Sequence, residues 1–533
     1  DKTFMNNIKV GMHAKTKGVA QYDRFTDSVT IIANIVEYTN RVVPTDVRKD
    51  VAPLKRIELH VHSKMSTLDG IDGVKDYVEV AKKWGHKAIA ITDHGNVQGF
   101  PELFKTTKDK SIKPIYGAEF TFIDEADTQI VKNPIDVAFD DAVFTVFDIE
   151  TTGLSVNYDK IIEIAAVKIK NNHIIEEYQT YVNPERGLSL LTTKITSIKN
   201  ADVQYAPTID KVLPEFKKFF EGTIMVAHNA QFDMGFIESV LQKNNLYDQD
   251  MTVVDTLSIA RNCYSDELKR FNLKAVARYF KVELTQHHRA IYDTRATADI
   301  FLHMLRDAKK QGVKNLKDFN LLSVKGSAYK HVIPKTINLL VQNQVGLRNL
   351  FQIVSEANTN YFHKGARLLK RILDKHRAGI LVGSGCMGSA FLETAMNKSY
   401  EQMRETAKYY DYLELQPVSD FLYLKDDIEN VEDVMKDTFQ KIIKVGRELN
   451  IPIVVSGDTY HIREQDSIFR DIYVQTNQVG GGLHRLARYD NIPSQYFRTT
   501  EEMLNEFSWL EEEFAFEIVV FNLLFYILPF LFH

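Results

Sequence analysis

Cysteine is scarce in this sequence of 533 residues: only Cys263 and Cys386 are present. Two cysteines exclude a fold built on disulfide bonds and are typical of a reducing cytoplasm. Proline and glycine are also few (13 and 25), and no low-complexity tract occurs, so no long segment has the composition of a disordered region. No apolar run reaches the roughly 20 residues of a membrane-spanning helix, and the first residues lack the apolar core of a signal peptide. We therefore expect a cytoplasmic protein without a membrane anchor.

The ends of the sequence predict a piece of a longer protein. The first residue is not Met, and residues 521–533 form an apolar run interrupted by Pro529. That run is shorter than the roughly 20 residues of a membrane span, so we expect a buried end or an aberrant tail, and the sequence leaves truncation and a change of reading frame open. The net charge of -5 gives no bulk attraction to nucleic acid. A carboxylate site would be acidic before its metals bind, however, and would offset a basic track elsewhere.

The order of apolar patterns predicts a mixed α/β protein of three or four domains, since a domain usually has roughly 100–200 residues. Residues 5–38 read as a small β unit, and short apolar strands alternate with amphipathic helices over 54–122. A polar stretch at 124–142 reads as a linker. Residues 143–315 look self-contained, with three antiparallel strands followed mainly by helices. The alternation then resumes, which indicates one α/β domain interrupted by an inserted one.

Four acids and one histidine of the inserted segment form a candidate catalytic set. Asp148 and Glu150 alternate on one expected strand and therefore share a face. Asp233 follows a second strand in the expected first turn of a helix. His288 is expected to precede the helix that carries Asp293.

The residue types of this set suit metal-dependent phosphodiester hydrolysis. Two divalent ions about 4 Å apart can activate water and stabilise the leaving oxygen. Hard Mg²⁺ or Mn²⁺ prefers carboxylate oxygens, and a nearby imidazole can accept the proton of the attacking water. Taken alone, each member has an ordinary explanation: a solvated strand face, a helix cap, a surface histidine. Their order and their expected elements favour a shared site.

The motifs FDIETTG, HNAQFD and H-x4-D give residues 140–310 a resemblance to the DEDDh exonucleases. The sequence TQHHRAIYDT is especially similar to the proofreading domain inserted in PolC-type DNA polymerase III alpha subunits. The resemblance implies an RNase H-like fold and 3′→5′ hydrolysis of DNA that releases nucleoside 5′-monophosphates. It further implies that Asp148, Glu150, Asp233 and Asp293 bind two Mg²⁺ or Mn²⁺ ions and that His288 is the general base.

A second set of metal-binding residue types lies outside the inserted segment. The motif ELHVH places two histidines on one strand face, and further histidine and carboxylate residues follow at expected strand ends, a combination that suits Zn²⁺, Mn²⁺ or Fe. These segments resemble the polymerase-and-histidinol-phosphatase (PHP) domain, a (β/α)7-type barrel that PolC splits with its exonuclease. The ligands implied by this resemblance are His60, His62, Asp69, His94, Glu119, Cys386 and Asp458.

Two positions depart from the PHP pattern. Thr336 stands where the family has a histidine, with His331 the nearest one, and Tyr460 precedes His461 by one residue at the final histidine position. A shift of one residue along a strand reverses the direction of the side chain. We expect a structural or partly occupied metal site; an active phosphoesterase and an empty site remain open.

The resemblance to PolC extends to about residue 520 and includes no polymerase core, so we expect no DNA synthesis by this chain alone. The expected divisions are an OB-like segment at 1–45, the PHP domain at 46–130 and 316–520, the exonuclease at 131–315, and the tail at 521–533. The expected partners are a single-stranded 3′ DNA end or primer terminus and, through the parent polymerase, replisome components such as the sliding clamp. A non-catalytic scaffold and a PHP phosphoesterase are the alternatives to a replicative proofreading exonuclease.

Overall fold

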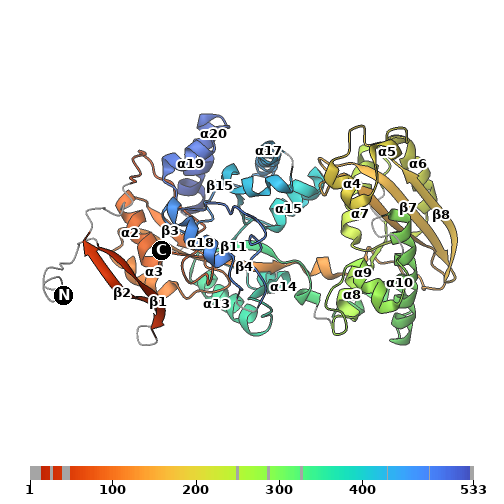
Figure 1. Ribbon diagram of the computed structural model, residues 1–533, viewed down its shortest axis with the longest axis horizontal. Coiled ribbons are helices and arrows are strands. Elements are labelled where there is room, and N and C mark those ends of the chain that lie inside the picture. Colours follow the sequence, from red (N-terminus) through yellow and green to blue (C-terminus); the bar gives the residue numbers. More distant parts are fainter. Residues whose placement is uncertain are drawn as a thin grey trace. The chain divides into compact units, whose positions relative to one another are not determined.

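The computed structural model describes residues 14–23, 28–38, 48–247, 251–284, 289–324, 328–428, 430–478 and 481–528. His288 and Pro529 lie outside these ranges. The chain divides into two compact units, Asp1–Val51 and Ala52–His533. Within the described ranges, no helix is long and apolar enough to cross a bilayer. The mixed α/β fold expected from the sequence is confirmed (Figure 1).

The first unit contains an antiparallel pair of strands, β1 (Ala14–Asp23) and β2 (Ser28–Tyr38). The register shifts between Lys17 and Gly18, which marks a bulge. A side chain at Gly18 would meet the carbonyl oxygen of Ile32 at 2.0 Å, so the close approach of the two backbones there requires glycine.

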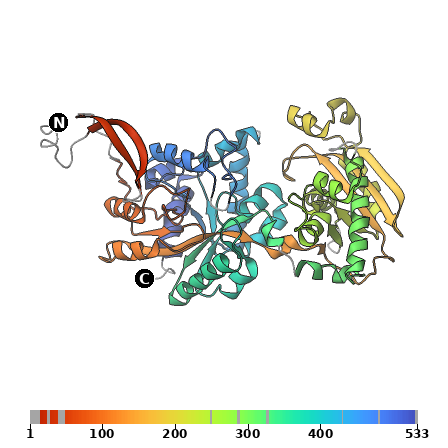
Figure 2. The same ribbon diagram turned by 60° about the horizontal axis from the view of Figure 1, so that its bottom comes forward.

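The inserted segment forms a six-stranded mixed sheet with the order β5-β10-β9-β6-β7-β8. Most of this segment is coloured yellow to green in Figures 1 and 2. Its strands are β5 (Val131–Lys132), β6 (Phe144–Thr151), β7 (Ile161–Lys170), β8 (His173–Tyr181), β9 (Ile224–Ala227) and β10 (Val253–Asp255). The expected turn joins β7 to β8, and both of its residues, Asn171 and Asn172, have positive φ angles of 51° and 64°. That geometry suits a tight hairpin.

Helices cover both faces of this sheet. The helices α6 (Ile209–Phe220) and α7 (Ala230–Lys243) pack against Phe147 and Ile149 of β6. The helices α8 (Thr256–Cys263), α9 (Leu273–Phe280) and α10 (Ala290–Lys310) pack against its alternate residues Phe144 and Val146. Strand alternation therefore divides the core into two layers. Short helices α4 (Leu190–Thr196), α5 (Asn200–Val203), α11 (Leu316–Phe319) and α12 (Leu321–Val324) complete the segment.

The expected linker at 124–142 needs a correction. Its residues Glu125–Thr128 form a 3₁₀ turn, η1, and Val131–Lys132 form β5, which pairs with β10 at the edge of the sheet. Val131 is fully buried, so a pair of apolar residues inside a polar stretch was enough to recruit it into the fold. At the other boundary, an antiparallel bridge between Ala138 and Asn315 brings the two ends of the inserted segment together.

The surrounding segments form a second mixed set of strands. One sheet has the strand order β12 (Arg367–Leu369), β4 (Lys113–Ile123), β11 (Lys335–Val341) and β13 (Ile380–Gly383), and β3 (Ala88–Ile91) also pairs with β4. A second sheet is the parallel pair β14 (Leu413–Leu415) and β15 (Ile453–Val455). Isolated bridges link these sheets: Glu58 to Ile89, Gly383 to Tyr412, and Val61 to Thr459. Together with the strand pairs, the bridges form a continuous cycle of seven segments.

Helices surround this cycle, and one apolar core joins them to it. They are α2 (Val74–Trp84), α3 (Phe100–Thr106), α13 (Gln344–Thr359), α14 (Lys370–Lys375), α15 (Ala390–Asn397), α16 (Tyr400–Ala407), α17 (Val431–Leu449), α18 (Ser467–Val474), α19 (Thr500–Glu506) and α20 (Glu512–Phe516), with 3₁₀ turns η2 (Ala328–Lys330), η3 (Val418–Asp426) and η4 (Glu464–Asp466).

The described part of the tail is a buried end. It continues α20 as the π-helical turns η5 (Glu517–Phe521) and η6 (Leu523–Ile527). Leu523 and Ile527 pack in one cluster with Leu59 and Val454 from the cycle of strands. The side chain of Asn522 donates a hydrogen bond of 2.8 Å to the carbonyl of Ile453, so a polar contact also fixes the tail.

Candidate functional site

Three of the predicted acids of the inserted segment meet at one end of its sheet. Asp148 and Glu150 lie on β6, and Asp293 lies in the first turn of α10, which packs on the face that both strand residues share. One carboxylate oxygen from each lies within 4.8 Å of the other two. Asp293 is buried, whereas Asp148 and Glu150 are partly buried. This is a cluster of hard oxygen ligands of the kind that holds Mg²⁺ or Mn²⁺.

Asp233 reaches the same cluster from the opposite face of the sheet. It lies in the first turn of α7 and is almost completely buried. Its carboxylate accepts a hydrogen bond of 3.3 Å from the backbone N–H of Ile149, the residue between Asp148 and Glu150. The four predicted acids therefore adjoin one another, with three in a group and Asp233 bound to the backbone beside them.

Burial raises the pKa values of Asp148, Glu150 and Asp233, and crowding by neighbouring acids adds to the rise for Asp148 and Glu150. Burial raises the pKa of Asp148 well above its ordinary range, and the neighbouring Asp233, Glu150 and Asp293 add to the rise. Burial, with the charges of Asp293 and Glu163, raises the pKa of Glu150 to about 8. Burial raises the pKa of Asp233 to about 8 as well. Four carboxylates held this close need cations to be ionised together, which is the electrostatic condition of a metal site.

Asp255, which the sequence interpretation did not single out, shapes the turn that leads to Asp233. It caps α8 by accepting hydrogen bonds from Leu257 N–H and the Ser258 hydroxyl, both 2.9 Å long. The same carboxylate accepts the backbone N–H of Asn229 at 2.9 Å. Asn229 has a φ of 73°, a left-handed conformation that needs such support. Asp255 thus fixes the start of α7.

A second acid missed from the sequence is Glu163, which is fully buried on β7. Its carboxylate accepts hydrogen bonds from the Gln179 side chain at 2.7 Å and from the backbone N–H of Ala290 at 3.4 Å. It also lies 3.6 Å from Nε of Arg289. Glu163 therefore holds the beginning of α10, the helix that carries Asp293. Its sequence signal was present, an acid in the apolar strand IIEIAAVKIK, but a single acid there reads equally as a tolerated buried residue.

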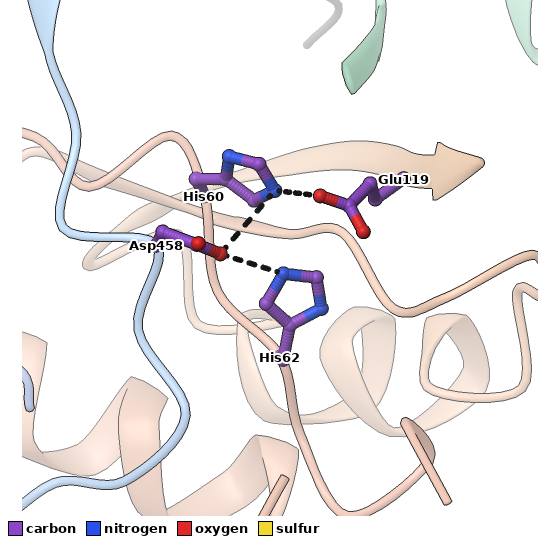
Figure 3. Close-up of side chains that lie close together, drawn as sticks. All are labelled: His60, His62, Glu119 and Asp458. Atoms are coloured by element: carbon purple, nitrogen blue, oxygen red, sulfur yellow. Dashed lines mark hydrogen bonds and ion pairs between the residues drawn. The ribbon is translucent and has the colours of Figure 1, made fainter. Parts of the chain in front are cut away.

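The predicted PHP ligands form a second cluster, in the surrounding domain. His60, His62, Glu119 and Asp458 each offer a ligand atom within 4.8 Å of the others, and all four are buried. Figure 3 shows Asp458 facing both histidines, 3.8 Å from Nε2 of His60 and 3.1 Å from Nε2 of His62. Nε2 of His60 also lies 3.2 Å from Glu119, yet it has no hydrogen-bond partner among the described residues. A buried nitrogen aimed at two carboxylates fits a cation between them.

Cys386 belongs to an adjoining group that includes a residue the sequence did not reveal. His60, Cys386 and Glu414 offer ligand atoms within 4.8 Å of one another. The Cys386 thiol donates to Glu414 at 3.1 Å, and Glu414 also accepts the Ser456 hydroxyl at 2.9 Å. Glu414 lies in the apolar strand LEL, where a single acid gives no motif. Burial, with the charge of Glu414, raises the pKa of the thiol well above its ordinary value.

Asp69 and His94 lie beside this cluster but outside the groups of possible metal ligands. Asp69 pairs with basic side chains instead: Arg470 at 2.8 Å, His94 at 3.2 Å and His484 at 3.3 Å. His94 also lies 2.9 Å from Glu119. Despite burial, Asp69 and Glu119 raise the pKa of His94 to about 10, so this imidazole is cationic at neutral pH. A bound metal at Asp69 would have to displace these pairs.

The two departures from the PHP pattern have structural counterparts. Thr336 pairs in register with Thr121 of β4, and its hydroxyl donates to the carbonyl of Met387. Tyr460 stacks on His62 with ring centroids 4.4 Å apart. His461 is buried elsewhere and binds the carbonyl of Arg463 through Nδ1 at 2.7 Å. None of these three side chains belongs to the described groups of possible metal ligands.

The exonuclease family RNase_T matches residues 145–301, the segment that carries the first cluster of acids. DNA polymerase III PolC-type of Bacillus subtilis is 40% identical over 98% of this chain, and its counterpart in Staphylococcus aureus is also 40% identical over 98%. The chain is a homologue of PolC-type DNA polymerase III. It spans 36% of the length of each of these two relatives.

The match to RNase_T identifies the inserted segment of this PolC homologue as a DEDDh exonuclease domain. Solved structures similar to it include Exonuclease X in complex with 5′ overhanging duplex DNA. That structure is 25% identical, the match covers 33% of this chain and 99% of that chain, and the TM-score is 0.27. E. coli Exonuclease I in complex with a dA16 oligonucleotide is 21% identical, with coverage of 32% and 42% and a TM-score of 0.29.

Proposed function

We propose that this chain removes nucleotides one at a time from the 3′ end of single-stranded DNA by metal-dependent hydrolysis, as the proofreading part of a bacterial replicase. The observation that carries the proposal is the convergence of Asp148, Glu150 and Asp293 within 4.8 Å, with Asp233 beside them. Two Mg²⁺ or Mn²⁺ ions, when bound, would activate the water and stabilise the leaving 3′ oxygen. The products would be nucleoside 5′-monophosphates.

The protein residues have distinct tasks in this proposal. Asp148, Glu150, Asp233 and Asp293 hold the ions, while Glu163 and Asp255 fix the helices that present Asp293 and Asp233. The general base is His288, assigned from its place in the motif, since it lies outside the described residues. Proofreading follows from the preference for a single strand, because a mismatched primer end frays more readily than a paired one.

The test is the release of 5′-mononucleotides from 3′-labelled single-stranded DNA with Mg²⁺ or Mn²⁺. Asp148→Ala should lower the rate by about 10³ or more, since it removes one of the four carboxylates that would hold the ions. Asp140→Ala is a matched control, because Asp140 is an exposed acid paired with Lys309 outside the cluster. Equal rates for the parent and Asp148→Ala would reject the assignment.

For the surrounding domain we propose a PHP-type barrel with a structural or partly occupied metal site. The closed cycle of seven paired segments supports the barrel. The Nε2 of His60, which faces Glu119 and Asp458 without a hydrogen bond to either, supports a cation such as Zn²⁺, Mn²⁺ or Fe. The cationic partners of Asp69 and the loss of a histidine at Thr336 weigh against an active phosphoesterase. The domain limits expected from the sequence, including an OB-like unit at 1–45, belong to the same proposal.

Three further expectations concern the parent protein. The chain contains no counterpart of a polymerase core, so DNA synthesis would reside elsewhere in the replicase. Contacts with a sliding clamp and other replisome components would be made through the parent polymerase, and a cytoplasmic location stays a prediction. A non-catalytic scaffold is the alternative, and it predicts metal-dependent stabilisation without release of nucleotides.

A further inference from the structure

A basic and aromatic surface lies where the exonuclease segment meets the second half of the surrounding domain. It consists of Phe271, Lys330, His331, Phe362, His363 and Lys364. The rings of Phe271 and His331 lie 4.8 Å apart, and those of His331 and His363 lie 6.3 Å apart. Phe362 is 51% exposed. The residues come from three stretches of sequence, so no single motif reveals the surface.

Arg367 joins two of these stretches beneath the surface. It is buried, and its guanidinium donates hydrogen bonds to the carbonyls of Tyr329 and His363, the latter 3.1 Å long. Tyr329 and Tyr361 pack edge to face with ring centroids 5.4 Å apart. The side chains above are therefore carried by a fixed backbone, which lowers the entropy lost when a ligand binds.

The positive charge of this surface is not balanced by nearby acids. Within the described ranges, Lys330, Lys364 and Arg367 form no ion pair with a carboxylate. Burial lowers the pKa of His331 and of His363, and neighbouring arginine and lysine side chains lower both pKa values further. At neutral pH the two imidazoles are therefore neutral rings set among fixed positive charges.

Of the acids near this surface, Glu125 pairs with Arg371 at 2.8 Å. Glu267, on the same loop as Phe271, acts on Tyr279 of α9. The charges of Asp255 and Asp127 act on Arg261, a further cation whose charge lowers the pKa of His331. The exposed side thus presents lysines and rings, the combination that binds a phosphate backbone and stacks unpaired bases.

A hydrogen bond connects this surface with the catalytic end of the sheet. The carbonyl of Phe271 accepts Nε2–H of His228 at 2.9 Å. His228 directly follows β9, and although burial lowers its pKa, Asp255 and Asp293 pull that pKa in the opposite direction. His228 also directly precedes Asn229, the N-cap of α7. Phe271 is therefore joined by one hydrogen bond to the turn from which the helix of Asp233 begins.

We propose that Phe271, Lys330, His331, Phe362, His363 and Lys364 bind the single-stranded DNA that leads to the exonuclease site. The lysines contact successive phosphates, and Phe362 with the imidazole rings stacks on bases. This inference rests on the proposed function. It adds a DNA-binding surface, and most of the residues of that surface come from the surrounding domain. This local positive surface would let the chain bind negatively charged DNA even though the net charge of the chain is negative.

The test measures binding of a fluorescein-labelled oligo(dT) to the full chain by anisotropy, in EDTA so that the strand stays intact. The double variant Lys330→Ala/Lys364→Ala should bind about fivefold or more weakly near 0.1 M salt. It should also lower the slope of log K against log salt by about 1.4, or about 0.7 per phosphate contact. Phe362→Ala should weaken binding about fivefold and leave the salt slope unchanged.

The control is Lys105→Ala/Lys108→Ala, the same charge change at two exposed lysines of the α3 region. The proposal is overturned if this control weakens binding as much as the test pair, or if the test pair keeps the affinity and salt slope of the parent. With metal present, the test pair should raise KM for oligo(dT) and leave hydrolysis of thymidine 5′-phosphate p-nitrophenyl ester unchanged. Failure of the parent to hydrolyse either substrate would reject the proposed function, while the EDTA comparison would still decide this inference.

Discussion

Glu150 and Glu163 lie directly opposite each other on the antiparallel strands β6 and β7. Like charges in directly opposed positions destabilise a sheet. Glu163 is held by Gln179, Ala290 N–H and Arg289, whereas Glu150 faces the other acids of the cluster. The pair therefore costs stability in the metal-free protein and raises the affinity of the site for cations.

Metal-free protein should lose stability as the pH rises from about 4 toward 8. The pKa values of Glu150 and Asp233 are both raised to about 8, above the ordinary range, so the folded state favours their protonated forms. The stability that these two protonated carboxyl groups contribute is fully present below about pH 4, and it is lost as the pH rises through the folded pKa values. The melting temperature in EDTA should fall by about 4 °C or more, and Mg²⁺ should reverse the fall at pH 8. A melting temperature in EDTA that does not change with pH would contradict the raised pKa values of Glu150 and Asp233.

Glu163→Gln should shift that metal-free transition to lower pH. The substitution keeps the shape of the side chain but removes a charge that raises the pKa of Glu150. Glu177→Gln is the control, since Glu177 lies on β8 of the same sheet and pairs with exposed Arg295. The measurement is the melting temperature in EDTA across pH. Identical shifts in both variants would mean that position in the sheet, rather than proximity to Glu150, determines the effect.

Asp255→Ala should destabilise the protein by about 1–2 kcal/mol and lower the exonuclease rate. The change removes the cap of α8 and the acceptor for Asn229 N–H, on which the start of α7 and the placement of Asp233 depend. Asp255→Asn should retain most of the stability, because asparagine caps helices about as well as aspartate. Urea denaturation and nucleotide release measure the two effects. If Asp255→Asn is stable but releases nucleotides as slowly as Asp255→Ala, the rate depends on the charge of Asp255 and not on its capping of α8.

Asn157→Ala should weaken the attachment of the exonuclease domain to the surrounding domain. Asn157 lies in the loop that follows the strand of Asp148 and Glu150, and its amide donates to the carbonyls of Met396 at 3.2 Å and Lys398 at 2.9 Å. These carbonyls end α15, where backbone acceptors otherwise lack partners. We expect a loss of about 1 kcal/mol together with a lower exonuclease rate.

The matched control for that prediction is Asn349→Ala, which removes a single bond to the carbonyl of Ala378 within the surrounding domain. Both variants should lose stability, but only Asn157→Ala should slow nucleotide release. Equal rates in the two variants would show that the loop keeps its geometry without the contact.

His60→Ala should remove tightly bound transition metal from the surrounding domain and leave the Mg²⁺-dependent exonuclease unchanged. His60 faces Glu119, Glu414 and Asp458, so it is common to both groups of possible ligands there. Metal content of the purified chain, measured by mass spectrometry, checks the prediction against His173→Ala at an exposed position of β8. Equal metal content in the two variants would argue for an empty cluster.

The sequence predicted residues whose types form recognisable motifs on regular elements. Asp148 and Glu150 alternate on a strand, and Asp233 and Asp293 occupy first turns of helices, so local periodicity was enough to place each one. Their convergence could be expected only from the resemblance to a known family. It depends on the pairing of β6 with β7 and β9, which no local pattern encodes.

The sequence could not predict the parts that Glu163, Asp255 and Glu414 play in the two clusters. Each is a lone acid whose partners come from distant stretches of the chain. The partners of Asp69 were missed for the same reason, since Arg470 lies 401 residues away in sequence. Long-range pairing of this kind is decided by packing. The strands expected at long apolar stretches were found, but the expected strand at ELHVH was not: Glu58 and Val61 form only isolated bridges. Strand β5 was missed because its two residues are too few to show a period.

The bridge between Ala138 and Asn315 also bears on how the molecule folds. Strands β4 and β11 are neighbours, yet the whole exonuclease segment separates them in sequence. Once that domain has folded, the bridge shortens the span to be closed to a few dozen residues, which lowers the entropic cost of joining the strands by about 1.5 kcal/mol. The inserted domain would then act as a folding aid for the one around it, and slowing its folding would delay both.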